Sequence, residues 1–378
     1  MEPQSFLDST ATRTASATRH ALLFALTVVA SPACSDDPAA ADTSPDTTVT
    51  DTTIPDTTVT DTAPDTTVTD TTVTDTTVTD TVADTTPGVT DFTNAIFLET
   101  SGDCGDYARE YAASVKDLQS NTPWASMVSI TTDGATCSLT SNNIPNHDFN
   151  QTGRFATPIR EVDRTYVFSR LPTLAATSTA LSQRSFNAIM LNGVPLDLLS
   201  AGCYRPNSPG ADANGNVAIG CTVNDPWLLD PLGANNRFGT DEHNAHTQPD
   251  GTYHYHGNPN AMFDDEAGDV RSPVIGFAAD GFPIYGTWFP DPTTGVVRKA
   301  ISGYTLKAGM RPSSASDPGG SYDGTYVDDW EFTAAGDLDA CNGMTVDGQY
   351  GYYVTDAYPW VMGCLSGTPN ASFDKGRP

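Results

Sequence analysis

The sequence predicts a mainly β protein: a single disulfide-stapled β-rich domain, sandwich-like or irregular, with few short helices, preceded by a disordered linker. Three observations predict it. Apolar runs are short and lie between turn residues, with 31 Gly and 27 Pro in 378 residues. Six of the seven cysteines fall in the C-terminal three quarters of the chain. An Asp/Thr-rich stretch before them lacks large apolar groups to bury.

Residues 1–33 are expected to be a signal peptide. Arg13 and other basic residues precede the apolar run "ALLFALTVVA" and the small-residue segment "SPAC". The apolar run is too short to span a bilayer, which needs about 20 residues. Cleavage after Ala33 leaves two alternatives: plain secretion, or lipidation of Cys34, which we favour because Cys34 is the odd cysteine. The expected location is the cell envelope, as an outer-surface lipoprotein.

Residues 34–90 are expected to be a disordered linker. The array repeats "DTTVT" and related pentapeptides, so it carries many like charges and little to bury. A β-solenoid of short repeats is the alternative, but no turn glycine recurs. Residues 91–378 then form the functional domain.

The formal net charge of −29 excludes some partners. No basic patch is visible in the sequence, so nucleic acid is not an expected partner. An acidic surface instead enriches metal ions near it. The expected partner is an extracellular small molecule or polymer, with membrane contact only through a lipid anchor at Cys34.

The cysteines of the domain are expected to form three disulfides. Their number is even, the chain is exported, and no C-x-x-C spacing is present. Fifteen connectivities are possible, and loop lengths favour the sequential set, each bridge contributing about 2 to 4 kcal/mol. The favoured pairs are Cys104 with Cys137, Cys203 with Cys221, and Cys341 with Cys364.

Strand composition between turn signals predicts five β segments. They are residues 127–132, 165–170, 187–196, 272–279 and 350–355. One helix is predicted at the periphery, where "DYAREYAASVKDL" at 106–118 has the best helical spacing.

Four of the six histidines lie between residues 243 and 256, on the two sides of the turn sequence "TQPDGT". A Pro-Asp-Gly turn predicts a hairpin with arms at 243–247 and 252–256. His254 and His256 then share one strand face, and both histidine pairs are expected to face one pocket. Imidazole suits copper and zinc. The alternative is a structural cluster of hydrogen-bonded histidines.

The run "TDEHNAHTQPDGTYHYHGNPNAMF", with "SPVIGFAADGFPIYG" after it, resembles the YHYH-motif protein family. The resemblance runs from about residue 120 to 373 and includes "NNIPNHDF", "PGGSYDGTYVDDWEF" and "YPWVMGCLSGTP". Asn143 stands where the family has glycine, a change that a left-handed turn tolerates. The resemblance implies a shared domain and site but no particular reaction. It also adds His147, so the expected metal ligands are His147, His243, His246, His254 and His256.

Other polar residues are expected to orient these ligands or to act chemically. Asp280, between an apolar strand and a turn, is the candidate general base, with an Asx-turn role as the equal alternative. Asp241, Tyr253, Tyr255 and Tyr285 are expected around the ligands.

Two classes of function follow, because no phosphate loop, nucleophile elbow or HExxH helix is present. The first is a metal-dependent enzyme, hydrolytic or oxidative, holding a copper or zinc ion. The second is a non-catalytic cell-surface module that captures metal or binds a polymer through tryptophans, although tryptophans in a β-rich core are usually packing. The candidate tryptophans are Trp227, Trp288, Trp330 and Trp360.

Overall fold

The computed structural model describes residues 88–376 except 234, 236–237 and 267. These residues belong to one compact unit. The expected signal peptide, the lipidation site Cys34 and nearly all of the expected linker lie outside the described residues. Among the described residues, no helix is long and apolar enough to span a membrane.

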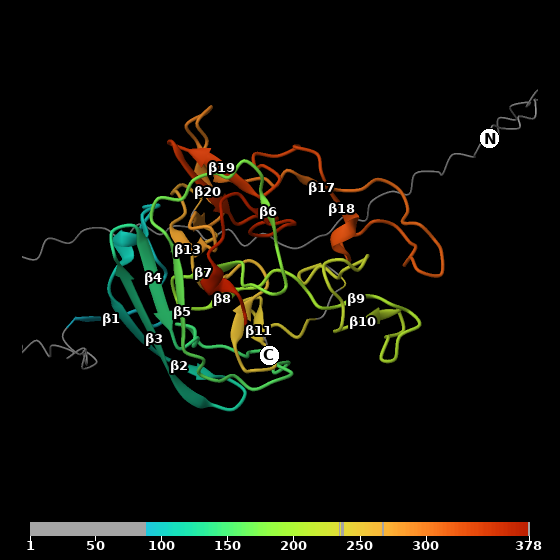
Figure 1. The fold of residues 1–378 in the computed structure, drawn as a ribbon, viewed down its shortest axis with the longest axis horizontal. Helices are drawn as coiled ribbons and strands as arrows, with labels where there is room; N and C mark the ends of the chain where they lie inside the picture. Colours follow the sequence, from blue (N-terminus) through green and yellow to red (C-terminus); the bar gives the residue numbers. More distant parts are fainter. Residues whose placement is uncertain (1–87, 234, 236–237, 267, 377–378) are drawn as a thin grey trace, which may run out of the picture. The chain divides into compact units, whose positions relative to one another are not determined.

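The first sheet is a five-stranded meander that forms one layer of the fold (Figure 1). Its strand order follows the sequence, and only β1 runs parallel to its neighbour. Strand β1 begins at Val89, two residues before the expected domain boundary at residue 91. The strands are β1 (Val89–Asp91), β2 (Glu110–Asp117), β3 (Thr122–Thr132), β4 (Thr136–Ser141) and β5 (Arg164–Ser169).

The helix predicted at 106–118 is wrong. A short 3-10 turn, η1 (Cys104–Tyr107), is followed by strand β2. Tyr111, Ala113 and Val115 are buried in alternation with more exposed residues, which is the period of a strand. Every residue of β2 pairs with β3, which satisfies the backbone of this strand, so tertiary context overrides its helical spacing.

The second sheet has eight strands and carries the histidine hairpin at one edge. All five predicted β segments contain strands, two in the first sheet and three here, although residues 187–196 fold as two short antiparallel strands joined by a turn. The order is β11 (Ala245–Thr247), β12 (Tyr253–Tyr255), β8 (Pro195–Leu196), β7 (Ala188–Met190), β13 (Val274–Ala278), β14 (Pro283–Tyr285), β20 (Gln349–Tyr353) and β19 (Gly343–Val346).

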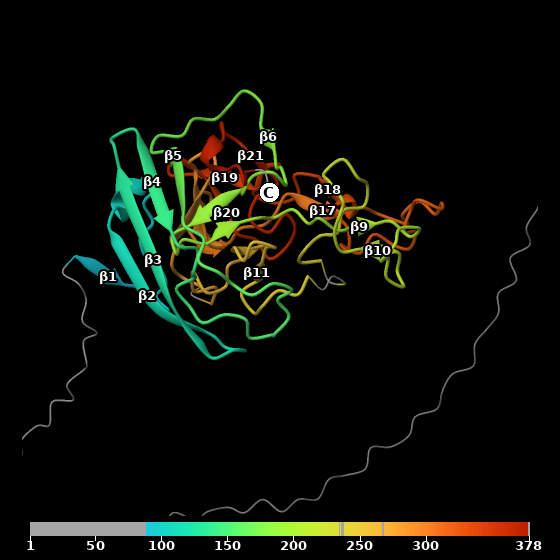
Figure 2. The same ribbon diagram turned by 60° about the horizontal axis from the view of Figure 1, so that its bottom comes forward.

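The two sheets share one core, as expected for a sandwich-like domain. Phe168 of β5 stacks on Phe277 of β13 with ring centroids 5.1 Å apart. The Ser141 hydroxyl at the end of β4 donates to the backbone oxygen of Gly193 in the β7–β8 turn. Figure 2 shows the meander lying against the second sheet. The histidine hairpin is therefore fixed to a rigid scaffold.

Four two-stranded sheets complete the fold, and the other helical segments described are two short 3-10 turns. The paired strands are β9 (Cys203–Tyr204) with β10 (Asn216–Val217), β15 (Trp288–Pro290) with β16 (Val297–Lys299), β17 (Tyr304–Leu306) with β18 (Trp330–Phe332), and β6 (Thr179–Ala180) with β21 (Cys364–Leu365). The turns are η2 (Val327–Asp329) and η3 (Ala371–Phe373).

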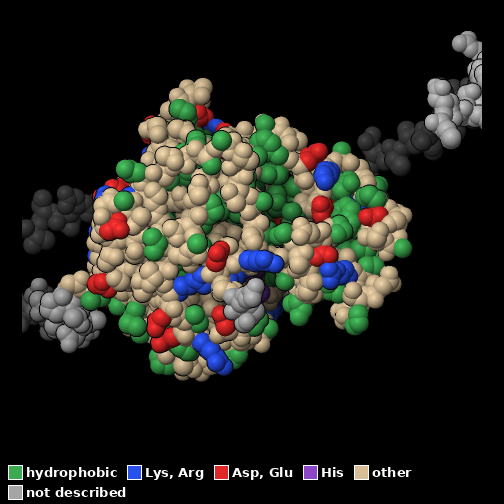
Figure 3. All heavy atoms as spheres, viewed as in Figure 1, with side chains coloured by type: hydrophobic (Ala, Val, Ile, Leu, Met, Phe, Trp, Pro, Cys, Tyr) green, Lys and Arg blue, Asp and Glu red, His purple; other side chains and the backbone are tan. Residues whose placement is uncertain are grey.

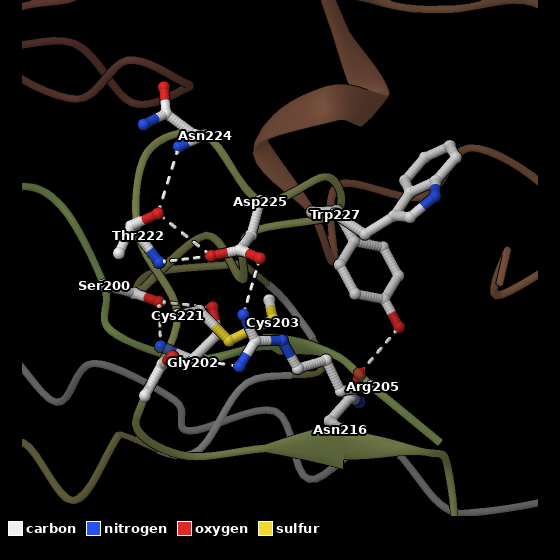
Figure 4. The surroundings of a disulfide bond; sticks show 12 residues. Ser200, Gly202, Cys203, Arg205, Asn216, Cys221, Thr222, Asn224, Asp225 and Trp227 are labelled. Carbon is white, nitrogen blue, oxygen red and sulfur yellow. Dashed lines mark hydrogen bonds and ion pairs between the residues drawn. A yellow bond between two sulfur atoms is a disulfide. The ribbon is translucent and has the colours of Figure 1, made fainter. Parts of the chain in front are cut away.

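The three disulfides join the pairs that the sequence favoured. They are Cys104–Cys137, Cys203–Cys221 and Cys341–Cys364. The second closes the small lobe of β9 and β10, where Arg205 and Asp225 form an ion pair beside it (Figure 4). This lobe has its own small apolar cluster, so the disulfide supplements a limited core. On the face drawn in Figure 3, acidic and basic side chains are interspersed.

Candidate metal centre

The predicted histidine hairpin is present. Strands β11 and β12 pair antiparallel, with His246 directly opposite His254. The turn closes with a hydrogen bond from the Gly251 backbone N–H to the Gln248 carbonyl, and Gly251 has a φ of 93°. That conformation favours glycine, so the Pro-Asp-Gly sequence specifies the turn.

Three imidazoles converge at this hairpin: His246, His254 and His256. The Nε2 atom of His256 lies 3.1 Å from that of His254 and 3.0 Å from that of His246. One ligand atom from each residue lies within 4.8 Å of the other two, so the group can hold a metal ion. His254 and His256 are buried, at 2% and 4% exposure, while His246 is half-buried.

The opposite ring edges of these histidines face the backbone. Nδ1 of His246 lies 2.7 Å from the Phe238 carbonyl, and Nδ1 of His254 lies 3.2 Å from the Thr252 carbonyl. Neutral imidazoles that donate through Nδ1 have a free lone pair on Nε2. The Asp197 backbone lies next to the His256 ring, but among the described residues Nδ1 of His256 has no partner within hydrogen-bond geometry. Carbonyl contacts of this kind orient metal-binding histidines.

The environment keeps these three rings neutral. Burial lowers the pKa of His246, and it lowers the pKa values of His254 and His256 far below the usual range. The neighbouring imidazoles act in the same direction on His254 and His256. Neutral imidazole is the form that binds a metal.

Hydrogen bonding alone satisfies this group poorly. With Nδ1 of His246 and His254 protonated, His256 has one Nε2 proton to share between two acceptors, and its own buried Nδ1 finds no hydrogen-bond donor in the described part of the chain. A metal ion instead accepts all three Nε2 lone pairs. Tetrahedral ligands about 2.05 Å from zinc lie about 3.3 Å apart, close to the spacings at His256. The residues present therefore fit a metal ion better than a hydrogen-bonded cluster.

The expectation that five histidines share one ion is corrected. His147 and His243 form a second group, with ring centroids 4.0 Å apart. Nε2 of His147 bonds the Tyr255 hydroxyl at 2.8 Å, and Tyr255 points to the face of β12 opposite His254 and His256. His243 precedes β11 in a turn and contacts the Gln151 amide at 2.9 Å. Strand alternation therefore separates this pair from the other three.

Asp241, Tyr253 and Tyr255 support the hairpin from its second face. Asp241 is buried and accepts from the Tyr253 hydroxyl at 2.8 Å and from the His243 backbone N–H at 3.0 Å. The Tyr255 hydroxyl accepts from the Asn192 amide at 2.9 Å in addition to its bond with His147. These residues position the strand that carries His254 and His256 without contacting those rings' Nε2 atoms.

Asn143 has the left-handed backbone expected at its position, with a φ of 65°. Its side-chain amide also donates to the Tyr253 carbonyl at 3.0 Å. Asparagine therefore tolerates the turn and adds a bond to the hairpin that glycine cannot make.

Asp280 and Tyr285 lie away from the three histidines, which corrects the roles expected for them beside the metal ligands and leaves the Asx-turn alternative for Asp280. Asp280 follows β13, and β8 and β7 separate β13 from β12. It accepts from the Tyr352 hydroxyl at 2.7 Å and the Gly367 N–H at 2.8 Å, while Phe282 N–H completes an Asx turn at 3.3 Å. Burial raises the pKa of Asp280. Its partners are structural, and Tyr285 packs in parallel against Tyr353.

Sequence reasoning missed Asp197, whose backbone lies next to the ring of His256. Leu196 pairs with Tyr255 across the parallel β8–β12 ladder, so the next residues, Asp197 and His256, point to the same face. Asp197 forms an ion pair with Lys375 and accepts from the Gln248 amide at 2.7 Å. The sequence shows only an acidic residue at the end of an apolar segment. The pairing of β8 with β12 is needed to place that residue near His256.

The fold and this centre define a β-sandwich protein with a buried three-histidine site suited to a transition metal. The model of the family described as YHYH protein matches residues 165–367. The chain therefore belongs to the YHYH protein family, as its motifs indicated. The matched range includes His246, His254 and His256 but not His147. No curated protein and no solved structure matches the chain.

Proposed function

We propose that this YHYH protein is an exported metalloprotein whose centre of His246, His254 and His256 binds a divalent transition metal, zinc or copper. The observation that carries the proposal is the convergence of three Nε2 atoms, with Nδ1 of two rings held by carbonyls. Imidazole ligands suit both metals, so metal supply helps to decide between them.

The number of ligands favours an open centre. Structural zinc sites have four protein ligands, whereas catalytic sites have three and leave one position for water or substrate. Three imidazoles form the group here among the described residues. Such a centre supports hydrolysis by activated water, or oxygen chemistry when the metal is redox active. We therefore infer a metal-dependent enzyme of hydrolytic or oxidative type.

The burial of the centre restricts what reaches it. Two surface hollows of the described chain, of about 500 and 230 Å³, are lined by residues other than the three histidines. His246 is the most exposed of the three histidines, and the Phe238 ring lies 5.8 Å from that of His256. The open position is thus suited to water or another small ligand. Metal capture without turnover is the second candidate, and this burial is the observation that favours it.

The polymer-binding alternative has less support. Trp227 is buried, and the indole N–H groups of Trp288 and Trp360 donate to Asp265 and Asp230 within the protein. The fourth tryptophan, Trp330, stacks on a tyrosine ring. None of these four lines either hollow. They serve as packing residues rather than as an exposed aromatic platform.

Export and lipidation belong to the same proposal. Three disulfides support an oxidising compartment outside the cytoplasm. The segment ending at Ala33 supplies the signal, and Cys34 supplies the lipid anchor. Mass spectrometry of the protein from its own host tests this, because a lipidated Cys34 gives a heavier N-terminal peptide that partitions into detergent. An unmodified N-terminal peptide in the medium contradicts the anchor.

Metal content tests the central proposal. Elemental analysis of protein purified from its own host is expected to give about one zinc or copper ion per chain, and the His254→Ala, His256→Ala double variant to give none. His243→Gln is the matched control, since His243 lies outside the three-histidine group. Retained metal in the double variant contradicts the site.

A further inference from the structure

We propose that Asp197 holds the ligand in the open position of the histidine centre, accepting a hydrogen bond through Oδ1 from a metal-bound water. The inference rests on the proposed metal centre and deepens it. Asp197 is then a positioning residue. The small ligand that the centre prefers is one that can donate a hydrogen bond.

The strand register places Asp197 next to the centre. Leu196 is the parallel partner of Tyr255, and the Asp197 backbone N–H donates to the Tyr255 carbonyl at 2.8 Å. Asp197 directly follows β8 and His256 directly follows β12, so continuation of this register sets the two residues side by side. The Asp197 side chain is therefore the neighbour of His256 on the face that carries the imidazoles. The positive charge of Lys375, which pairs with Asp197, also acts to lower the pKa values of His254 and His256.

The two carboxylate oxygens of Asp197 differ. Oδ2 bonds the Lys375 ammonium and the Gln248 amide, the latter at 2.7 Å. Oδ1 is buried and has no hydrogen-bond partner among the described residues. The side chain as a whole is only 6% exposed. Leaving a buried carboxylate oxygen without a donor is unfavourable, so a donor is expected at Oδ1.

Lys375 and Gln248 keep the carboxylate in place. Gln248 begins the hairpin turn, two residues after His246, and its side-chain amide donates to Asp197 Oδ2. Lys375 approaches from the C-terminal segment, whose backbone is held by the Arg184 carbonyl. Two partners on one oxygen fix the orientation of the carboxylate and leave the other oxygen free to accept.

A bridging water fits better than direct coordination. Among the described residues, the ligand group with atoms within 4.8 Å contains three histidines and not Asp197. A water about 2.1 Å from zinc and about 2.7 Å from a carboxylate oxygen connects the two. The carboxylate accepts but cannot donate while ionised, so it selects water, hydroxide or an alcohol over ligands without a proton.

A crystal structure of the full mature protein soaked with zinc tests the geometry. We expect zinc on the three Nε2 atoms and a water within about 3 Å of Asp197 Oδ1. Zinc bound directly by Oδ1, or Oδ1 paired elsewhere, overturns the inference while leaving the metal centre intact. Absence of zinc from the three histidines overturns both proposals.

Azide binding to cobalt-loaded protein tests the role in solution, followed by the visible absorption of the cobalt ion. Azide bound to a metal lacks a proton to donate, so the free Oδ1 of wild type disfavours it. We expect Asp197→Asn to bind azide at least fivefold more tightly. Asp280→Asn, another buried carboxylate away from the histidines, is the matched control and is expected to match wild type.

The charge-balanced double variant Asp197→Asn, Lys375→Met separates the hydrogen bond from net charge. It removes one negative and one positive charge from the same ion pair. Retention of the fivefold tightening supports the positioning role. Return to the wild-type azide affinity shows that charge alone acted and overturns it.

Discussion

Zinc is expected to raise the melting temperature of the wild-type and His243→Gln proteins but hardly that of His254→Gln. His254 is buried and supplies one of three converging Nε2 atoms, whereas His243 lies in the separate pair with His147. Glutamine keeps a comparable volume and polarity at each position. The comparison within each variant, with and without zinc, cancels any effect of the substitution on the apo protein.

The size of the effect follows from binding linkage. Free zinc at about 100 times Kd stabilises the native state by about 2.7 kcal/mol. Loss of a supporting residue around a metal site already weakens binding by about 10- to 100-fold, so loss of a ligand is expected to reach the upper value. At the same free zinc concentration, the native state of the variant is then stabilised by about 0.4 kcal/mol. A domain near this size gains about 2 to 4 °C in melting temperature per kcal/mol. The zinc-dependent shift is therefore at least about 5 °C for wild type and about 1 °C for His254→Gln.

Differential scanning calorimetry of chelator-treated protein, with and without zinc, is the assay. An equal zinc-dependent shift in wild type and His254→Gln refutes the assignment of the centre. A loss of the shift in His243→Gln contradicts the separation of the two histidine groups. Copper can replace zinc in the same design if elemental analysis of the native protein finds copper.

Three further predictions concern the scaffold. Burial, followed by the nearby His243, lowers the pKa of His147 to about 3 from 6.5. Unfolding free energy should therefore fall by up to about 4 to 5 kcal/mol from this group as pH drops from 6.5 to 3, and urea unfolding of His147→Gln should show a shallower loss. Asn143→Ala should cost more stability than Asn143→Gly, since only glycine relieves the φ of 65°; equal losses would contradict strain there. Removing Cys203–Cys221 by double serine substitution should cost about 3 kcal/mol for a separation of 18 residues, and an unchanged urea midpoint would show that the small lobe folds without it.

Much of the fold was predictable because its signals are local. The five β segments, the Pro-Asp-Gly hairpin and the left-handed position of Asn143 each depend on a few neighbouring residues. The prediction of a helix at 106–118 was wrong because a short amphipathic segment can match both the helical and the strand spacing of apolar residues. Pairing with β3 decided between them.

The sequence by itself determined the family, the β class, the favoured disulfide pairs and the presence of a histidine-rich hairpin. Only the tertiary structure divided the histidines, joining His246 to His254 and His256 while turning His147 toward Tyr255. It also placed Asp280 away from the histidines and set Asp197 at the end of β8, the neighbour of β12. The physical reason is strand alternation combined with register. Neighbours in the sequence point to opposite faces, and residues about 60 positions apart meet when their strands pair.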